Sequence, residues 1–185
     1  MAITESDKPR YTAEQFYAII PEENTHAELI NGEIVMLAGA STRHQKIVGE
    51  VHYALLSHIK RNKGGCSVFM SPYDVELDDR NVYQPDILVI CDPSKIGEKR
   101  AYGAPDLVIE VLSESNMKRD LTVKHAAYFT AGVREYWIVD PFKDRTIVYR
   151  FDDPADISFY PFDKPVPVGI WGGRLEINIA ELLGE

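Results

Sequence analysis

Two short apolar runs in the middle of the chain each carry a carboxylate that a buried strand would not readily hold. Asp86 stands just before the β-branched run that ends at Ile90, and Glu110 lies inside the run from 107 to 112. An isolated buried carboxylate is costly to ionise, so it requires a cation, a hydrogen-bond network or a metal ion. Two acids on neighbouring core strands suit a divalent-metal site. The alternative is that one acid caps a strand and the other pairs with lysine or arginine.

Strand geometry decides which of the nearby acids can act together. Side chains alternate along a strand, so Asp106 and Glu110 share a face but lie about 13 Å apart. They cannot chelate one ion, and Asp106 is better interpreted as a turn residue after Pro105. Asp86 comes from a different strand and can lie directly opposite Glu110. With the backbone carbonyl of Val111, this pair would offer Mg²⁺ (or Mn²⁺) the hard oxygen ligands that it prefers.

A lysine follows these strands in an unexpected place. The sequence predicts a helix from about Lys118 to Ala131, with an apolar stripe that contains Met117, Leu121 and Tyr128. Lys124 falls within this stripe, where it can snorkel outward or pair with Asp120 four residues earlier. Because the helix directly follows the Glu110 strand, the amine can instead reach back over the end of that strand. There it would position or deprotonate a water, or stabilise charge on a phosphate.

The elements that must position these residues form an α/β domain with a mixed sheet flanked by helices. Asn31–Gly32 between two apolar runs predicts an N-terminal β-hairpin with a type I′ turn. A long helix is expected from about Ser41 to Asn62, followed by strands that return from Val82 through Ile90. The strand–helix–strand unit from Leu107 to Val139 should be a right-handed parallel crossover.

Length and composition are those of a soluble globular protein. The 185 residues suit a single domain, with a core at about 11–151 and a loop-rich C-terminal extension at 152–185. No apolar run approaches the roughly 20 residues of a membrane span, so no membrane partner is expected. The polar N-terminus lacks a secretory signal, and Cys66 and Cys91 form no CxxC pattern. We therefore expect a cytoplasmic protein with reduced thiols.

A net charge of −9 counts against a generic nucleic-acid coat protein. It does not exclude a nuclease, because metal-binding acids add negative charge and a local basic rim can still hold phosphate.

Several stretches taken together resemble the PD-(D/E)XK nuclease superfamily, and more closely its bacterial branch of restriction-endonuclease-like proteins of unknown role. The matching stretches are Ala27–Glu33, His44, Gln84–Asp86, Ala104–Ser113, Arg119–Asp120 with Lys124, and Gly132–Asp140. The resemblance covers about residues 11 to 151. It implies a restriction-endonuclease-like fold and metal-dependent hydrolysis of phosphodiester bonds, with Asp86 and Glu110 as the metal ligands.

The chain departs from the superfamily motif at one position. The residue two after the acid should be lysine, and here it is Leu112. Relocation of that lysine to the following helix is a known variation, and Lys124 fits it. The superfamily often adds an acid from an earlier element; Glu28 and Glu50 are the candidates, and Glu28 is favoured because it stands in a resembling stretch. His44 would orient a phosphate or a water, or else only hydrogen-bond locally.

Three functions are compatible with these residues. The leading hypothesis is a Mg²⁺-dependent DNA endonuclease. The second is a catalytically weak or inactive nuclease-fold protein that acts as a nucleic-acid or protein interaction module, motivated by Leu112 and the negative charge. The third is action on another phosphodiester, such as RNA. Because double-strand cleavage needs two active sites, we expect a homodimer. Its predicted surface is the aromatic C-terminal region with Phe159, Tyr160, Phe162 and Trp171.

Overall fold

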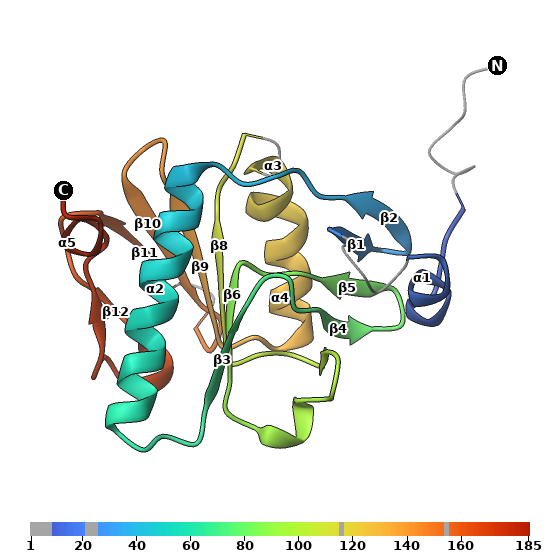
Figure 1. The fold of residues 1–185 in the computed structure, drawn as a ribbon, viewed down its shortest axis with the longest axis horizontal. Coiled ribbons are helices and arrows are strands. Elements are labelled where there is room, and N and C mark those ends of the chain that lie inside the picture. The colour runs from blue at the N-terminus through green and yellow to red at the C-terminus, as the bar shows by residue number, and fades with distance from the viewer. Residues whose placement is uncertain (1–8, 21–25, 115–116, 154–155) are drawn as a thin grey trace.

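Two mixed β-sheets organise the computed structural model, which describes residues 9–20, 26–114, 117–153 and 156–185 (Figure 1). The larger sheet has six strands in the order β11(Ile157–Pro161), β10(Arg145–Arg150), β9(Glu135–Asp140), β8(Leu107–Val111), β6(Ile87–Ile90) and β3(Ser67–Met70). The smaller sheet has five strands in the order β2(Glu33–Met36), β1(Ala27–Ile30), β5(Asn81–Tyr83), β4(Val75–Asp78) and β7(Ala101–Tyr102). Together with the helices, these sheets give the mixed α/β fold that the sequence predicts.

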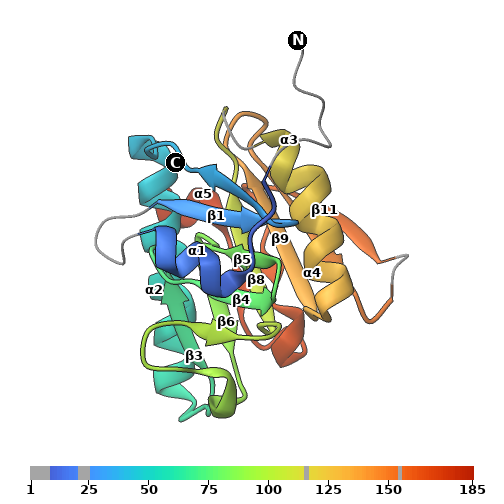
Figure 2. The ribbon, with the colours of Figure 1, turned by 90° about the vertical axis from the view of Figure 1, so that its right-hand side faces the viewer.

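Helices α2(Thr42–Arg61) and α4(His125–Ala131) cover opposite faces of the six-stranded sheet, which lies between them in Figure 2. Side chains alternate along β8, so Ile109 packs in the cluster with α2, whereas Val108 packs in the cluster with α4. The short helix α1(Ala13–Ile19) packs on β1 of the smaller sheet, with Phe16 buried at that contact. Glu110 lies two residues after Val108 on β8, so its side chain points to the same face of the sheet, toward α4.

The predicted hairpin and the parallel pairing of the predicted crossover are confirmed. β1 and β2 form an antiparallel hairpin, and both Asn31 and Gly32 have the positive φ angles of a type I′ turn (50° and 81°). The hydroxyl of Ser41 accepts a hydrogen bond from the His44 amide and caps α2. β8 and β9 are parallel, as the crossover requires, and β9 and β10 form an antiparallel pair.

The stretch from Val82 to Ile90 does not form one continuous strand. It divides into β5, in the smaller sheet, and β6, in the larger sheet, and residues 84–86 join the two. Pro85 has no amide proton to donate to a strand ladder, which accounts for the interruption. Asp86 therefore stands at the seam between the two sheets.

The helix expected from Lys118 to Ala131 is not a uniform α-helix. It begins as α3(Met117–Arg119), passes through a π-helical turn at Asp120–Lys124 and continues as α4. The wider turn changes which residues share a face. Leu121, expected in the apolar stripe, is 36% exposed, whereas Asp120 and Lys124 are buried.

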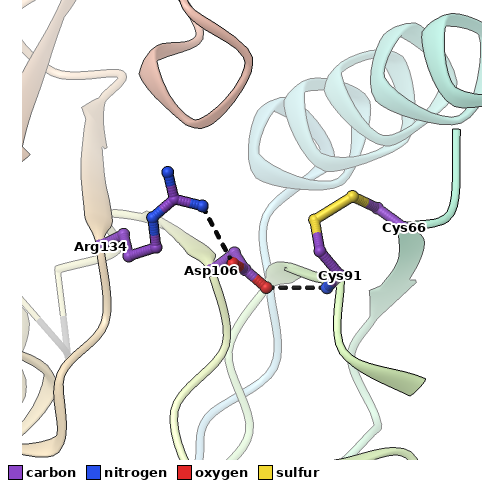
Figure 3. The surroundings of a disulfide bond; sticks show 4 residues. All are labelled: Cys66, Cys91, Asp106 and Arg134. Atoms are coloured by element: carbon purple, nitrogen blue, oxygen red, sulfur yellow. Dashed lines mark hydrogen bonds and ion pairs between the residues drawn. A yellow bond between two sulfur atoms is a disulfide. The ribbon is translucent and has the colours of Figure 1, made fainter.

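The two cysteines are joined, which corrects the expectation of reduced thiols. Cys66 and Cys91 form a disulfide, because the antiparallel register of β3 and β6 places them opposite each other just beyond the paired residues Ser67 and Ile90 (Figure 3). Asp106 beside them accepts the Cys91 amide proton at 2.7 Å and forms an ion pair with Arg134 at 3.2 Å. Asp106 is thus the turn residue that the sequence predicts, held away from Glu110.

The C-terminal extension contributes to the core. It contains β11, the small pair β12(Val166–Pro167) and β13(Glu176–Ile177), and helix α5(Ile179–Leu183). Phe162 and Ile179 are buried in the cluster that also holds α2, whereas Phe159 is exposed. Among the described residues, no helix has both the length and the apolar character needed to cross a membrane.

Candidate active site

The acids Asp86 and Glu110 meet as their strands predict. β6 and β8 pair with Ile87 opposite Ile109, so the next position places Asp86 opposite Glu110. Asp86 Oδ2 accepts the backbone N–H of Val111 at 2.7 Å and lies 3.1 Å from Nε2 of His44 at the start of α2. Asp86 is thereby fixed at the end of its strand by one backbone donor and one ring nitrogen.

Lys124 points into this acidic region. Its Nζ lies 2.8 Å from Glu110 Oε1, 2.8 Å from Glu28 Oε1 and 3.5 Å from Asp120 Oδ1. The residue is only 3% exposed, so its amine does not snorkel to solvent. Of the two alternatives for Lys124, snorkelling to solvent is therefore wrong. The pairing with Asp120 is present, but the contacts with the two glutamates are shorter. We call Glu28, Asp86, Glu110, Asp120 and Lys124 the acidic cluster.

The π-helical turn is anchored from the neighbouring sheet. The hydroxyl of Tyr136 on β9 donates a hydrogen bond to the backbone carbonyl of Asp120 at 3.1 Å, and both groups are buried. π-helical turns are uncommon and are frequent at functional sites. Here the turn carries two members of the acidic cluster, Asp120 and Lys124, at its two ends.

Glu28 reaches the cluster from the smaller sheet. Its Oε1 contacts Lys124 and accepts the Gln84 amide at 3.1 Å, and its Oε2 lies 3.9 Å from an Arg119 guanidinium nitrogen. Glu50, the other candidate for an additional acid, is exposed on α2 and does not line the cleft described below. The geometry therefore favours Glu28.

The residues around Glu110 include both apolar and polar neighbours. Leu112, at the position of the motif lysine, is buried in the apolar cluster with Val108 and Tyr136. The Tyr128 hydroxyl on α4 donates to Glu110 Oε1 at 2.9 Å, next to Lys124. The helix thus contributes both the cation and a neutral donor to the same carboxylate oxygen.

Burial and charge shift the pKa values of the cluster in a consistent direction. Burial opposes the charged form of Lys124, but Glu110, Glu28 and Asp120 outweigh it and raise the lysine pKa. Burial raises the pKa of Glu110 in spite of Lys124, and it raises the pKa of Asp120 to about 6. Burial and the neighbouring acids therefore favour the protonated forms of Glu110 and Asp120, whereas Lys124 stays charged.

His44 behaves differently from a surface histidine. Burial lowers the pKa of its ring, but the hydrogen bond and the negative charge of Asp86 outweigh burial and raise it. Because Asp86 is 42 residues away in the sequence, this contact is more than the local hydrogen bond that the sequence left open as an alternative.

The donor chemistry of the cluster fits a hard divalent cation. Asp86 and Glu110 supply carboxylate oxygens, and Glu110 also experiences the negative charges of Asp120 and Glu28. Neither Glu28 Oε2 nor the Asp120 oxygens have hydrogen-bond partners within the described residues. As the side chains stand, no three His, Cys, Asp or Glu in the described part of the chain could together hold a metal ion. Water would therefore have to complete the coordination of Mg²⁺, as it commonly does.

A cleft of about 420 Å³ opens above the cluster. Asp86, Glu110 and Lys124 line its inner part, with His44 and Arg119 beside them. Three residues of the site were not predicted from the sequence: Asp120, Tyr128 and Tyr136. The sequence indicates Asp120 only as an ion-pair partner of Lys124. Asp120, Lys124 and Tyr128 follow one another at intervals of four, and this spacing was the available signal for a polar helix face.

Comparison with known proteins places this site in a family context. The Uma2 family, described as "putative restriction endonuclease", matches residues 13–167. Two uncharacterized proteins of Synechocystis sp. are similar: sll1609 is 27% identical over 75% of this chain and 80% of its own length. The second, slr1290, is 24% identical over 80% of this chain and 78% of its own length.

The fold is also similar to that of a solved protein. The crystal structure of "a putative nuclease belonging to DUF820" from Anabaena variabilis superposes with a TM-score of 0.76 at 25% identity. The match covers 94% of this chain and 97% of the other.

Proposed function

The chain belongs to the Uma2 family, described as "putative restriction endonuclease", and from this premise we propose that it is a metal-dependent endonuclease that hydrolyses DNA phosphodiester bonds. The observation that carries the proposal is the position of Lys124, whose buried ammonium contacts Glu110 and Glu28 and stands in for the lysine missing at Leu112. The nuclease title of the similar Anabaena protein supports the same reaction class.

Each member of the acidic cluster has a role in this proposal. Asp86 and Glu110 would hold Mg²⁺ or Mn²⁺, with the Val111 carbonyl as a third oxygen ligand. A bound divalent cation neutralises phosphate charge and lowers the pKa of a coordinated water. Lys124 would stabilise negative charge on the phosphate or position the attacking water, and Glu28 would hold the lysine in place. His44 would fix the orientation of Asp86 through their 3.1 Å contact.

Plasmid nicking with and without Mg²⁺ or Mn²⁺ tests the activity. We expect metal-dependent nicking by the wild type and none by Asp86→Ala, with a matched exposed variant, Asp163→Ala, as the control. Calorimetric titration of Mn²⁺ into wild type and Glu110→Gln tests the shared site. Equal affinity in these two proteins would rule the shared site out. A folded protein that binds metal but never cleaves would instead favour the interaction-module alternative.

We also propose that the protein is a homodimer, because a single-site nuclease needs two copies to cut both strands. The exposed Phe159 on the edge strand β11 is the C-terminal aromatic residue best placed for such a contact, since Phe162 is buried. Light scattering at micromolar concentration decides the oligomeric state, and a monomer would end this part of the proposal.

A further inference from the structure

The cleft above the acidic cluster has uncharged outer walls. Residues 36–40 and 70–72 line it, and neither segment contains a charged residue. Met36 is 65% exposed and Met70 is 38% exposed, although both are large apolar side chains. Walls of this kind contact bases and sugars in preference to phosphates.

Few cations are available to hold a DNA backbone here. Lys124 and Arg119 are the lysine and arginine that line the cleft, and both already face Glu28. Proteins bind duplex DNA by neutralising many phosphates along its backbone with lysine and arginine. The lining of the cleft offers only Lys124 and Arg119 for this purpose, on a chain whose net charge is −9.

The depth of the reacting groups adds a geometric constraint. Glu110 and Lys124 are almost fully buried, so a phosphodiester reaches them only by descending between the two walls. The cleft volume of about 420 Å³ matches the size of sites that take small ligands. A nucleotide in a duplex must first be unstacked and unpaired to enter such a site, which costs free energy. A nucleotide in an unpaired strand avoids much of that cost.

From these observations we infer that the substrate is an unpaired DNA strand, and that the uncharged walls contact the bases that flank the phosphodiester to be cleaved. The inference rests on the proposed function and adds the substrate class. Met36 and Met70 would contact unpaired bases of any sequence, because apolar side chains can pack against any base face.

Three 5′-labelled DNA substrates of one sequence test the inference in single-turnover reactions with Mn²⁺: an unpaired strand, a blunt duplex, and a duplex with an unpaired flap. We expect cleavage of the strand and of the flap at least about 10-fold faster than that of the duplex, since only the duplex must first be unpaired and unstacked. Cleavage of the blunt duplex at the rate of the free strand would overturn the inference and leave the proposed function intact.

A small diester, bis(p-nitrophenyl) phosphate, separates the two claims, because it needs no strand recognition. If it is hydrolysed while no oligonucleotide is cleaved, the inferred substrate is wrong and the catalytic centre stands. If neither is hydrolysed, both claims fail. Met36→Glu should lower strand cleavage at least about 10-fold relative to diester hydrolysis, by repelling the phosphates. Met36→Leu should retain strand cleavage. Ile19→Glu, a matched change at an exposed residue outside the cleft, should alter neither reaction.

Discussion

Two neighbouring strands of the larger sheet each bury a glutamate, and the two glutamates are treated in opposite ways. Glu135 on β9 accepts the Trp137 indole N–H at 2.7 Å with one oxygen and the Ile170 amide at 2.8 Å with the other. Glu110 on β8 faces a lysine, a tyrosine and three further acids. Glu135 ties the C-terminal extension to the sheet with neutral donors. The comparison teaches that two equally buried glutamates can have different partners: neutral donors fix Glu135, whereas Glu110 lies among the charged groups of the proposed active site.

The largest contrast should come from Lys124→Met, which removes the cation from the cluster. Cleavage should fall roughly 10²-fold or more, the scale of losing one positioned electrostatic group. Three buried acids would lose a common partner, so the free energy of unfolding should fall by about 3–5 kcal/mol at neutral pH. Single-turnover nicking rates and urea unfolding measure the two effects. Lys143→Met, at an exposed lysine, is the matched control. Wild-type cleavage by the Lys124 variant would remove the lysine from the site.

The next effect is a pH dependence that arises within the acidic cluster. Burial raises the pKa of Asp120 from 3.8 to about 6. The folded protein therefore keeps this proton over a pH range in which the unfolded chain has lost it. Between about pH 4 and 6 the free energy of unfolding should decrease as pH rises, by up to about 3 kcal/mol. Asp120→Asn should remove that decrease. Urea unfolding in EDTA at a series of pH values compares the two proteins, and identical slopes would contradict the prediction.

Glu135→Gln tests the anchoring side of the comparison. Glutamine retains one acceptor oxygen but presents an amide group to the second N–H, which leaves a buried donor unsatisfied. We expect a loss of about 1–3 kcal/mol in the free energy of unfolding and no change in cleavage by the folded protein. Thermal unfolding and nicking assays on the same preparation measure both quantities. A tenfold loss of cleavage at unchanged stability would break the distinction between the two glutamates.

The smallest effect is expected from Tyr136→Phe, which deletes the hydroxyl that anchors the π-helical turn. The loss of one buried hydrogen bond should cost about 1 kcal/mol. Amide hydrogen exchange over residues 120–124 should become faster, because the turn that carries Lys124 loses its anchor. Cleavage should fall less than in Lys124→Met. Tyr149→Phe, on the neighbouring strand β10, is the control, and equal exchange in both variants would show that the hydroxyl does not hold the turn.

The sequence predicted those parts of the site that depend on strand period and turn chemistry. Asp86 opposite Glu110 follows from two apolar runs and the period of a strand, and the hairpin that carries Glu28 follows from Asn31–Gly32. The first two predictions are confirmed because each one depends on local rules. The family resemblance proposed Lys124 as the displaced lysine; the structure places its amine beside Glu110, and its catalytic role stays a prediction.

The features that the sequence did not predict depend on tertiary contacts. A π-helical turn differs from an α-helix by one residue in register, and its anchor, Tyr136, lies on another element. The division of Val82–Ile90 between two sheets depends on what each half pairs with, and periodicity does not report pairing. Likewise the disulfide arises from strand register, since Cys66 and Cys91 are 25 residues apart.

The seam between the two sheets gives the ion pairs of Lys124 a second significance. Glu28 belongs to the five-stranded sheet and Glu110 to the six-stranded sheet, and one ammonium group contacts both. The ion pairs of Lys124 therefore connect the two sheets, and their lengths depend on the distance between the sheets. Any force, mutation or solvent change that slides one sheet against the other stretches these ion pairs early, so loss of activity should precede loss of secondary structure during gradual unfolding.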